Sequence, residues 1–115
     1  MANVLIIDDE APILNLMAKA CETAGHTVTA VLSEPEALAA LDREAPDLMI
    51  VDLVLGDKSG MDLVRSTTQR FPDTKVVMVT GHGSVETAVE AMRLGAFDYL
   101  TKPFEVTDLL RTVNL

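Results

Sequence analysis

Short apolar runs recur at similar intervals along this sequence, and they restrict the possible folds more than any other feature. The runs are too rich in apolar side chains for strands with one face in water, so they favour strands buried in a parallel sheet. Amphipathic segments with apolar residues at helical spacing lie between the runs. The predicted strands are Val4–Ile7, Val28–Val31, Leu48–Val51, Val76–Val79 and the less apolar Phe97–Leu100.

The segments between the runs are predicted helices with recognisable ends. Ser33 and Glu36 form a capping-box pattern, and Ser84 can cap the helix that follows it. Gly25 and Gly95 stand where two helices should stop. The predicted helices are Pro12–Ala24, Glu34–Glu44, Gly60–Arg70, Ser84–Leu94 and Val106–Leu115, and the fourth carries Val85, Ala88, Val89 and Met92 on one apolar face.

Strict alternation of strands and helices indicates an α/β domain with a parallel sheet, and right-handed crossovers leave few arrangements for five strands. We predict a doubly wound, flavodoxin-like fold in which the strands, numbered in chain order, are arranged 2-1-3-4-5. A length of 115 residues and a hydrophobic content of 49% suit one core. No linker or internal repeat indicates a second domain.

The formal net charge of −9 opposes general attraction to nucleic acid or to an anionic membrane. The run Val4–Ile7 is too short to cross a bilayer, and no basic segment precedes it as in a signal peptide. We therefore expect a cytoplasmic protein that contacts neither nucleic acid nor membrane directly. The single cysteine is interpreted as a core thiol, because it belongs to the apolar stripe Ile13, Leu16, Met17, Ala20, Cys21 and Ala24.

Polar residues follow the apolar runs at the strand ends where open parallel sheets bind ligands. Asp8-Asp9-Glu10 follows the first run and Asp52 the third, and these two strands are neighbours in the predicted order. Asp8, Asp9 and Asp52 must therefore crowd one another. Unit charges about 4 Å apart repel by roughly 4 kcal/mol at an effective dielectric near 20, so the cluster should hold a proton or bind a cation.

A hard divalent ion with oxygen ligands fits this cluster, and Mg²⁺ is preferred to Ca²⁺ because it keeps several waters that a phosphate can displace. Lys102, after the fifth run, could balance a carboxylate or a phosphoryl oxygen, or could be a solvated loop lysine. Thr80 follows the fourth run, and its hydroxyl could alternatively do no more than cap the next helix. His82 has no second histidine nearby in the sequence, so we reject a zinc site.

Asp8-Asp9, Asp52, Thr80 and Lys102-Pro103, each at the end of a successive strand, resemble the residues shared by receiver domains of two-component response regulators. The resemblance covers essentially the whole chain. It implies that Asp52 is the phospho-acceptor and attacks a phosphohistidine of a histidine kinase or a phosphotransfer protein. It also implies a signalling domain that catalyses its own phosphotransfer and slow autodephosphorylation.

The same resemblance assigns the metal ligands. Asp9 and Asp52 would bind Mg²⁺ directly together with the backbone carbonyl of Val54, while Asp8 would act mainly through water. Lys102 would contact the acceptor carboxylate and then the phosphoryl group.

The resemblance further implies a switch. Thr80 would donate a hydrogen bond to a phosphoryl oxygen, and Tyr99 would turn inward behind it. The Lys102–Pro103 peptide bond would be cis, which aims the lysine side chain toward Asp52. Phosphorylation would be read on the surface formed by residues 84–115, which could also form a homodimer.

The stretches 80–88 and 95–100 are most similar to receivers of sigma-54-dependent transcription activators. In those proteins the receiver controls an attached ATPase and DNA-binding domain. We therefore expect residues 1–115 to be one receiver domain from the N-terminal part of a longer regulator, with its last helix cut short. A single-domain receiver or a phosphorelay intermediate is the alternative.

The chain departs from the family pattern in the loop after Asp52. Leu55-Gly56 stands where Met-Pro is frequent, and Ser59 stands where an acid is common. Glycine in place of proline should loosen the loop, and Val54 offers no polar side chain to position a hydrolytic water.

Two other functions of this fold fit less well. Magnesium-dependent phosphatases that form an aspartyl phosphate usually carry a second aspartate where this chain has Val54. A flavin or nucleotide site would need a glycine-rich phosphate loop after the first strand, where acids stand instead.

Overall fold

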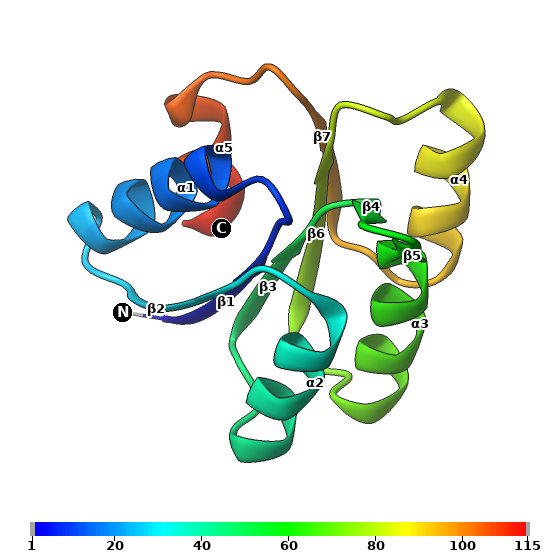
Figure 1. Cartoon of the computed structure of the whole chain (residues 1–115), viewed down its shortest axis with the longest axis horizontal. Coiled ribbons are helices and arrows are strands. Elements are labelled where there is room, and N and C mark those ends of the chain that lie inside the picture. Colours follow the sequence, from blue (N-terminus) through cyan, green and yellow to red (C-terminus); the bar gives the residue numbers. More distant parts are fainter. Residues whose placement is uncertain (1, 115) are drawn as a thin grey trace.

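A five-stranded parallel sheet forms the centre of the computed structural model, which describes residues 2–114 (Figure 1). The strand order β2-β1-β3-β6-β7 confirms the predicted order, because β6 and β7 are the fourth and fifth predicted strands. The strands are β1 Asn3–Ile7, β2 Thr27–Val31, β3 Leu48–Val51, β6 Lys75–Thr80 and β7 Asp98–Thr101.

Five helices cover the two faces of the sheet. In Figure 1, α1 and α5 lie on one side, and α2, α3 and α4 lie on the other. The helices are α1 Ala11–Thr23, α2 Glu34–Arg43, α3 Gly60–Arg70, α4 Val85–Arg93 and α5 Val106–Val113. All lie at the predicted places, although the predicted end of the last helix, Leu115, is outside the described residues. No helix within residues 2–114 is both long and apolar enough to span a membrane.

The core has two halves because successive strand side chains point to opposite faces. Ile6 pairs with Ile50 in the β1–β3 ladder, and both pack with α1 and α5. The next pair, Ile7 and Val51, packs with α2, α3 and α4. All four side chains are completely buried, which fits central strands covered on both faces.

The predicted helix caps are present in part. Ser84 and Thr87 form a complete capping box at the start of α4. At α2, Ser33 accepts from the Glu36 amide, but the Glu36 carboxylate bonds the Ser33 hydroxyl instead of the Ser33 amide, so the box predicted there is incomplete.

One expectation about burial was wrong at the margin of the sheet. The strand β2 was predicted to be buried, but it lies at the sheet edge, and Thr29 and Ala30 are exposed. The predicted apolar face of α4 lies toward solvent: Val85 is 82% exposed and Met92 48%. Ala91 is the fully buried residue of α4, because the helix lies beside the edge strand β7 and meets the core through this small side chain.

The apolar stripe of α1 is rotated from the predicted one. Leu14, Met17 and Cys21 face the core, whereas Leu16 is 50% exposed. The interpretation of Cys21 as a core thiol is confirmed, and burial raises its pKa to about 11.

A short antiparallel hairpin that was not predicted joins β3 to α3. Its strands are β4 Val54–Leu55 and β5 Lys58–Ser59. The hairpin lies next to the carboxyl ends of the central strands in Figure 1 and so borders the candidate site.

Two leucines of α1 offer a matched test of the core. Leu14→Ala is expected to lower the free energy of unfolding by about 2–5 kcal/mol, because it leaves a cavity under α1. Leu16→Ala, the same change on the exposed face, should stay within about 0.5 kcal/mol of the wild type. Urea unfolding followed by circular dichroism measures both. Equal losses would contradict the assigned orientation of α1.

Candidate functional site

Four strands of the sheet direct polar residues to one edge. The amide of Asp52 donates to the carbonyl of Ile7 (3.0 Å), which extends the β1–β3 ladder by one residue and sets Asp52 beside the end of β1. Asp8 and Asp52 are buried, 0% and 2% exposed, and Thr80 at the end of β6 is also completely buried. Lys102 follows β7. The predicted edge of the sheet is therefore the place where these groups gather.

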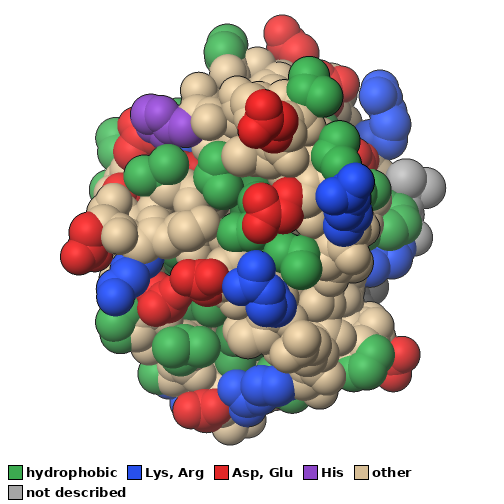
Figure 2. Space-filling model, turned by 90° about the vertical axis from the view of Figure 1, so that its right-hand side faces the viewer, with side chains coloured by type: hydrophobic (Ala, Val, Ile, Leu, Met, Phe, Trp, Pro, Cys, Tyr) green, Lys and Arg blue, Asp and Glu red, His purple; other side chains and the backbone are tan. Residues whose placement is uncertain are grey.

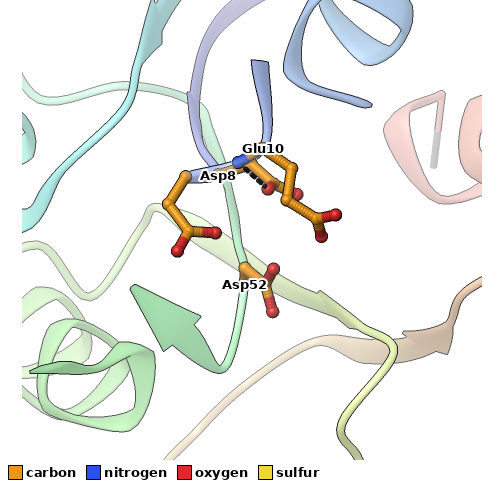
Figure 3. Close-up of side chains that lie close together, drawn as sticks. Asp8, Glu10 and Asp52 are labelled. Atoms are coloured by element: carbon orange, nitrogen blue, oxygen red, sulfur yellow. Dashed lines mark hydrogen bonds between the residues drawn. The ribbon is translucent and has the colours of Figure 1, made fainter. Parts of the chain in front are cut away.

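Four carboxylates form a tight cluster at this edge. Asp8, Asp9, Glu10 and Asp52 each offer an oxygen, and these oxygens all lie within 4.8 Å of one another. Figure 3 shows Asp8 and Glu10 on the segment after β1, facing Asp52 at the end of β3. Asp9 and Glu10 are exposed, so the cluster is open to solvent.

Backbone amides stabilise three of these carboxylates. The Glu10 amide donates to Asp8 Oδ1 (2.9 Å), and the Val54 amide donates to Asp52 Oδ1 (3.2 Å). The Gly56 amide, in the turn between β4 and β5, donates to Asp9 Oδ2 (3.0 Å). The fixed backbone thus orients one oxygen of each of these groups.

Lys102 neutralises part of the negative charge. Its Nζ lies 2.7 Å from Asp8 Oδ2, 3.0 Å from Asp52 Oδ2 and 3.4 Å from a Glu10 oxygen. The Lys102–Pro103 peptide bond is cis, the conformation that the resemblance implies. The reading of Lys102 as a solvated loop lysine is wrong, since its side chain is 11% exposed.

Burial and charge shift the pKa values of this pair in different ways. Burial raises the pKa of Asp8 above its usual value, and hydrogen bonds from Lys102 and the Glu10 amide only partly offset this. Burial opposes the charged form of Lys102, but hydrogen bonds and attraction to Asp8 and Asp52 outweigh it and raise the lysine pKa. Lys102 therefore carries a charge throughout the physiological range.

The donor set suits a hard divalent cation. One ammonium faces four carboxylates, so the site keeps a formal excess of negative charge. All four groups offer carboxylate oxygens, the ligand type that Mg²⁺ and Ca²⁺ prefer. The residues of this chain thus fit a divalent ion of this class.

The start of α3 packs closely against the segment Asp52–Leu53. A Cβ at Gly60 would overlap the carbonyl oxygen of Asp52, and the Gly60 amide donates to the Leu53 carbonyl (2.6 Å). Ser59, where the family often has an acid, is the N-cap of α3 and accepts from the Met61 amide (3.1 Å).

Thr80 and Tyr99 bond to groups outside the carboxylate cluster. The Thr80 hydroxyl accepts from the His82 amide (3.0 Å), and Ser84, not Thr80, caps the helix that follows. The half-buried Tyr99 hydroxyl lies 3.0 Å from the Thr87 hydroxyl in the α4 capping box.

Two contributors to the site were not recognised from the sequence. Glu10 was seen only as part of an acidic run, yet it reaches Lys102. The Gly56 amide had no sequence signal, since its contact with Asp9 depends on the unpredicted hairpin.

Residues 4–114 match the family model of the response regulator receiver domain. The acid tolerance regulatory protein ActR of Sinorhizobium medicae is 39% identical over 108 residues, which are 94% of this chain and 56% of ActR. The alginate biosynthesis transcriptional regulatory protein AlgB of Pseudomonas aeruginosa is 42% identical over 100 residues, 87% of this chain and 22% of AlgB. The chain thus spans little more than half of one relative and under a quarter of the other.

A solved structure supports the same relationship. A response regulator protein from Burkholderia pseudomallei matches with a TM-score of 0.90 and 34% identity, over 96% of this chain and 65% of that one. That crystal structure contains a phosphorylated aspartic acid, a calcium ion and citrate.

The raised pKa of Asp8 predicts how stability depends on pH. Asp8→Asn should raise the melting temperature in metal-free buffer at neutral pH, because it removes a buried charge from a crowded acidic cluster. The amide oxygen can still accept from Lys102, and loss of the hydrogen bond from the Glu10 amide offsets only part of the gain. A carboxyl group with a raised pKa in the folded state destabilises the fold above that pKa, and the penalty disappears as the pH falls through it.

The advantage of Asp8→Asn over the wild type should therefore shrink as the pH is lowered from about 7 toward about 4, the range above the usual aspartate pKa. Thermal melts with a chelator present measure the difference. A difference in melting temperature that stays constant or grows at acid pH would contradict a destabilising buried charge at Asp8.

Proposed function

This chain belongs to the response regulator receiver domain family of two-component systems, and we propose that its Asp52 accepts a phosphoryl group from the phosphohistidine of a histidine kinase or a phosphotransfer protein. The observation that carries the proposal is the environment of Asp52. Its carboxylate is buried at the end of a central strand, with Oδ1 fixed by the Val54 amide and Oδ2 bonded to Lys102.

Position and charge would drive the reaction. An Asp52 oxygen attacks phosphorus, a P–O bond forms, the P–N bond to histidine breaks, and an acyl phosphate results. The Lys102 ammonium balances Asp52 before transfer and would face a phosphoryl oxygen afterwards. The protein needs no separate base because the carboxylate is already the nucleophile.

We propose Mg²⁺ as the cofactor, held directly by Asp9, Asp52 and the carbonyl of Val54 and through water by Asp8. The open, all-oxygen cluster supports a hard divalent ion, and the burial of Asp8 against Lys102 fits an indirect role. When bound, the ion supplies positive charge that offsets charge on the transferred phosphoryl oxygens.

Thr80 and Tyr99 are proposed to carry the signal away from the site. A phosphoryl group that draws the Thr80 hydroxyl away from the His82 amide would make room for Tyr99, which would leave Thr87 at the start of α4. The affected surface consists of α4, β7 and α5, where Val85, Val89 and Met92 are exposed. Figure 2, which looks onto the side where α3 and α4 lie, shows hydrophobic side chains among charged ones.

We further propose that this surface controls an output domain, and that the output is transcription. ActR and AlgB extend well beyond the part that this chain matches, and AlgB is a transcriptional regulator. A homodimer through residues 84–115 is the alternative use of the same surface, and a single-domain phosphorelay intermediate is the alternative role.

Phosphorylation can be tested by intact-mass measurement after incubation with acetyl phosphate and Mg²⁺. The wild type should gain one phosphoryl group, because the small donor bypasses the kinase while Asp52 remains the nucleophile. Asp52→Asn, which keeps the size of the side chain, should gain none. An adduct that persists in Asp52→Asn, or none in the wild type, would refute the assignment.

The switch can be separated from the chemistry with Thr80→Ala. This variant should accept phosphate at Asp52 yet lose most of the amide chemical-shift changes in residues 84–113. Without the Thr80 hydroxyl, the phosphoryl group has no group at the end of β6 to draw toward it, so Tyr99 should keep its contact with Thr87. Changes that cluster on α2 in the phosphorylated wild type, with residues 84–113 silent, would exclude this route.

A further inference from the structure

We infer that the backbone amide of Gly56 is a positioning group for the divalent ion, because it holds the Asp9 carboxylate in the orientation that binds metal. The inference rests on the proposed metal site and adds a component that lies outside the carboxylate cluster. It concerns the contact between the segment after β1 and the turn of the β4–β5 hairpin.

The contact joins two segments that are far apart in the sequence. Leu55 pairs with Lys58, so Gly56 and Asp57 form the tight turn of the hairpin. The Gly56 amide reaches Asp9 Oδ2 at 3.0 Å across 47 residues of sequence. Among residues 2–114, it is the group that donates a hydrogen bond to the Asp9 carboxylate.

Asp9 needs such a partner more than Asp8 or Asp52 does. Those two carboxylates are buried and bonded to Lys102, whereas Asp9 is exposed and has no ion pair among the described residues. Repulsion from the neighbouring carboxylates would turn an untethered Asp9 toward solvent. The Gly56 amide opposes that movement without adding a charge to the site.

The geometry favours assistance over competition with the ion. The Gly56 amide uses one of the roughly four acceptor positions of the Asp9 carboxylate, and Asp9 offers an oxygen within 4.8 Å of oxygens from the other three carboxylates. A carboxylate with one oxygen bonded to an amide has its other oxygen available, which is how outer hydrogen bonds orient metal ligands.

The identity of residue 56 makes this contact possible. Gly56 has a φ of +65°, in the left-handed region that glycine adopts freely and asparagine tolerates. The proline that the family often has here would lack the amide and require a φ near −65°. The sequence suggested that Gly56 loosens the loop, whereas in the structure its amide ties the loop to Asp9.

Two substitutions separate the amide from the side chain. Gly56→Pro removes the donor, while Gly56→Asn keeps both the donor and the backbone conformation. A Cβ at position 56 would have no heavy atom within 4 Å, so the asparagine side chain has space. The two variants thus form a matched pair.

Isothermal titration of the unphosphorylated 115-residue chain with Mg²⁺ tests the inference. Gly56→Pro should lower the affinity roughly tenfold, the lower end of the effect of outer hydrogen bonds on metal sites. Gly56→Asn should restore affinity to within about twofold of the wild type, because asparagine keeps the donor at the same φ. Affinity unchanged in Gly56→Pro, or reduced equally in both variants, would overturn the role of the amide.

Amide hydrogen exchange gives a second readout that does not depend on the proline variant folding. In metal-free buffer, exchange of the Gly56 amide should be faster in Asp9→Ala than in the wild type. An unchanged rate would show that the contact does not form in solution and would overturn the inference. If the wild type itself binds no Mg²⁺ at millimolar concentration, the proposed metal site fails, and this inference fails with it.

Discussion

The rest of the site depends on one interaction, the Lys102 ammonium between the buried carboxylates of Asp8 and Asp52. Two carboxylates at the ends of adjacent central strands cannot be buried together without a cation, because desolvation and mutual repulsion both oppose their charged forms. Lys102 offsets part of that cost, so that both carboxylates can be buried side by side at the ends of β1 and β3. The exposed members of the cluster, Asp9 and Glu10, keep the additional negative charge that favours a divalent ion.

Much of this arrangement could be predicted from the sequence because it follows from periodicity. Apolar runs specify the strands, and in a parallel sheet the residues after each run meet at one edge. That rule is enough to bring Asp8, Asp52, Thr80 and Lys102 to the same edge without knowledge of any loop. The metal ligands and the roles of Thr80 and Tyr99 came from the family resemblance and remain proposals.

The features that the sequence did not predict have a common physical origin. Periodicity shows which residues are apolar, but it does not show how much of each strand or helix is covered by the rest of the chain. The edge strand β2 exposes Thr29 and Ala30 although Val31 is buried, and the apolar outer face of α4 is uncovered in the described chain. The hairpin β4–β5 is too short to produce an alternating pattern. Its contact with Asp9 is made by a backbone amide, which every residue except proline carries, so no residue type indicates it.

The bond between Lys102 and Asp8 joins residues 94 positions apart, nearly the whole length of the chain. In kinetic terms this is a contact of very high order, and the chain loses the entropy of closing a long loop before such a contact stabilises it. A nascent chain that has not yet added β7 holds two central carboxylates without their cation. The cation that balances Asp8 and Asp52 therefore reaches the site only when the last strand of the sheet is in place.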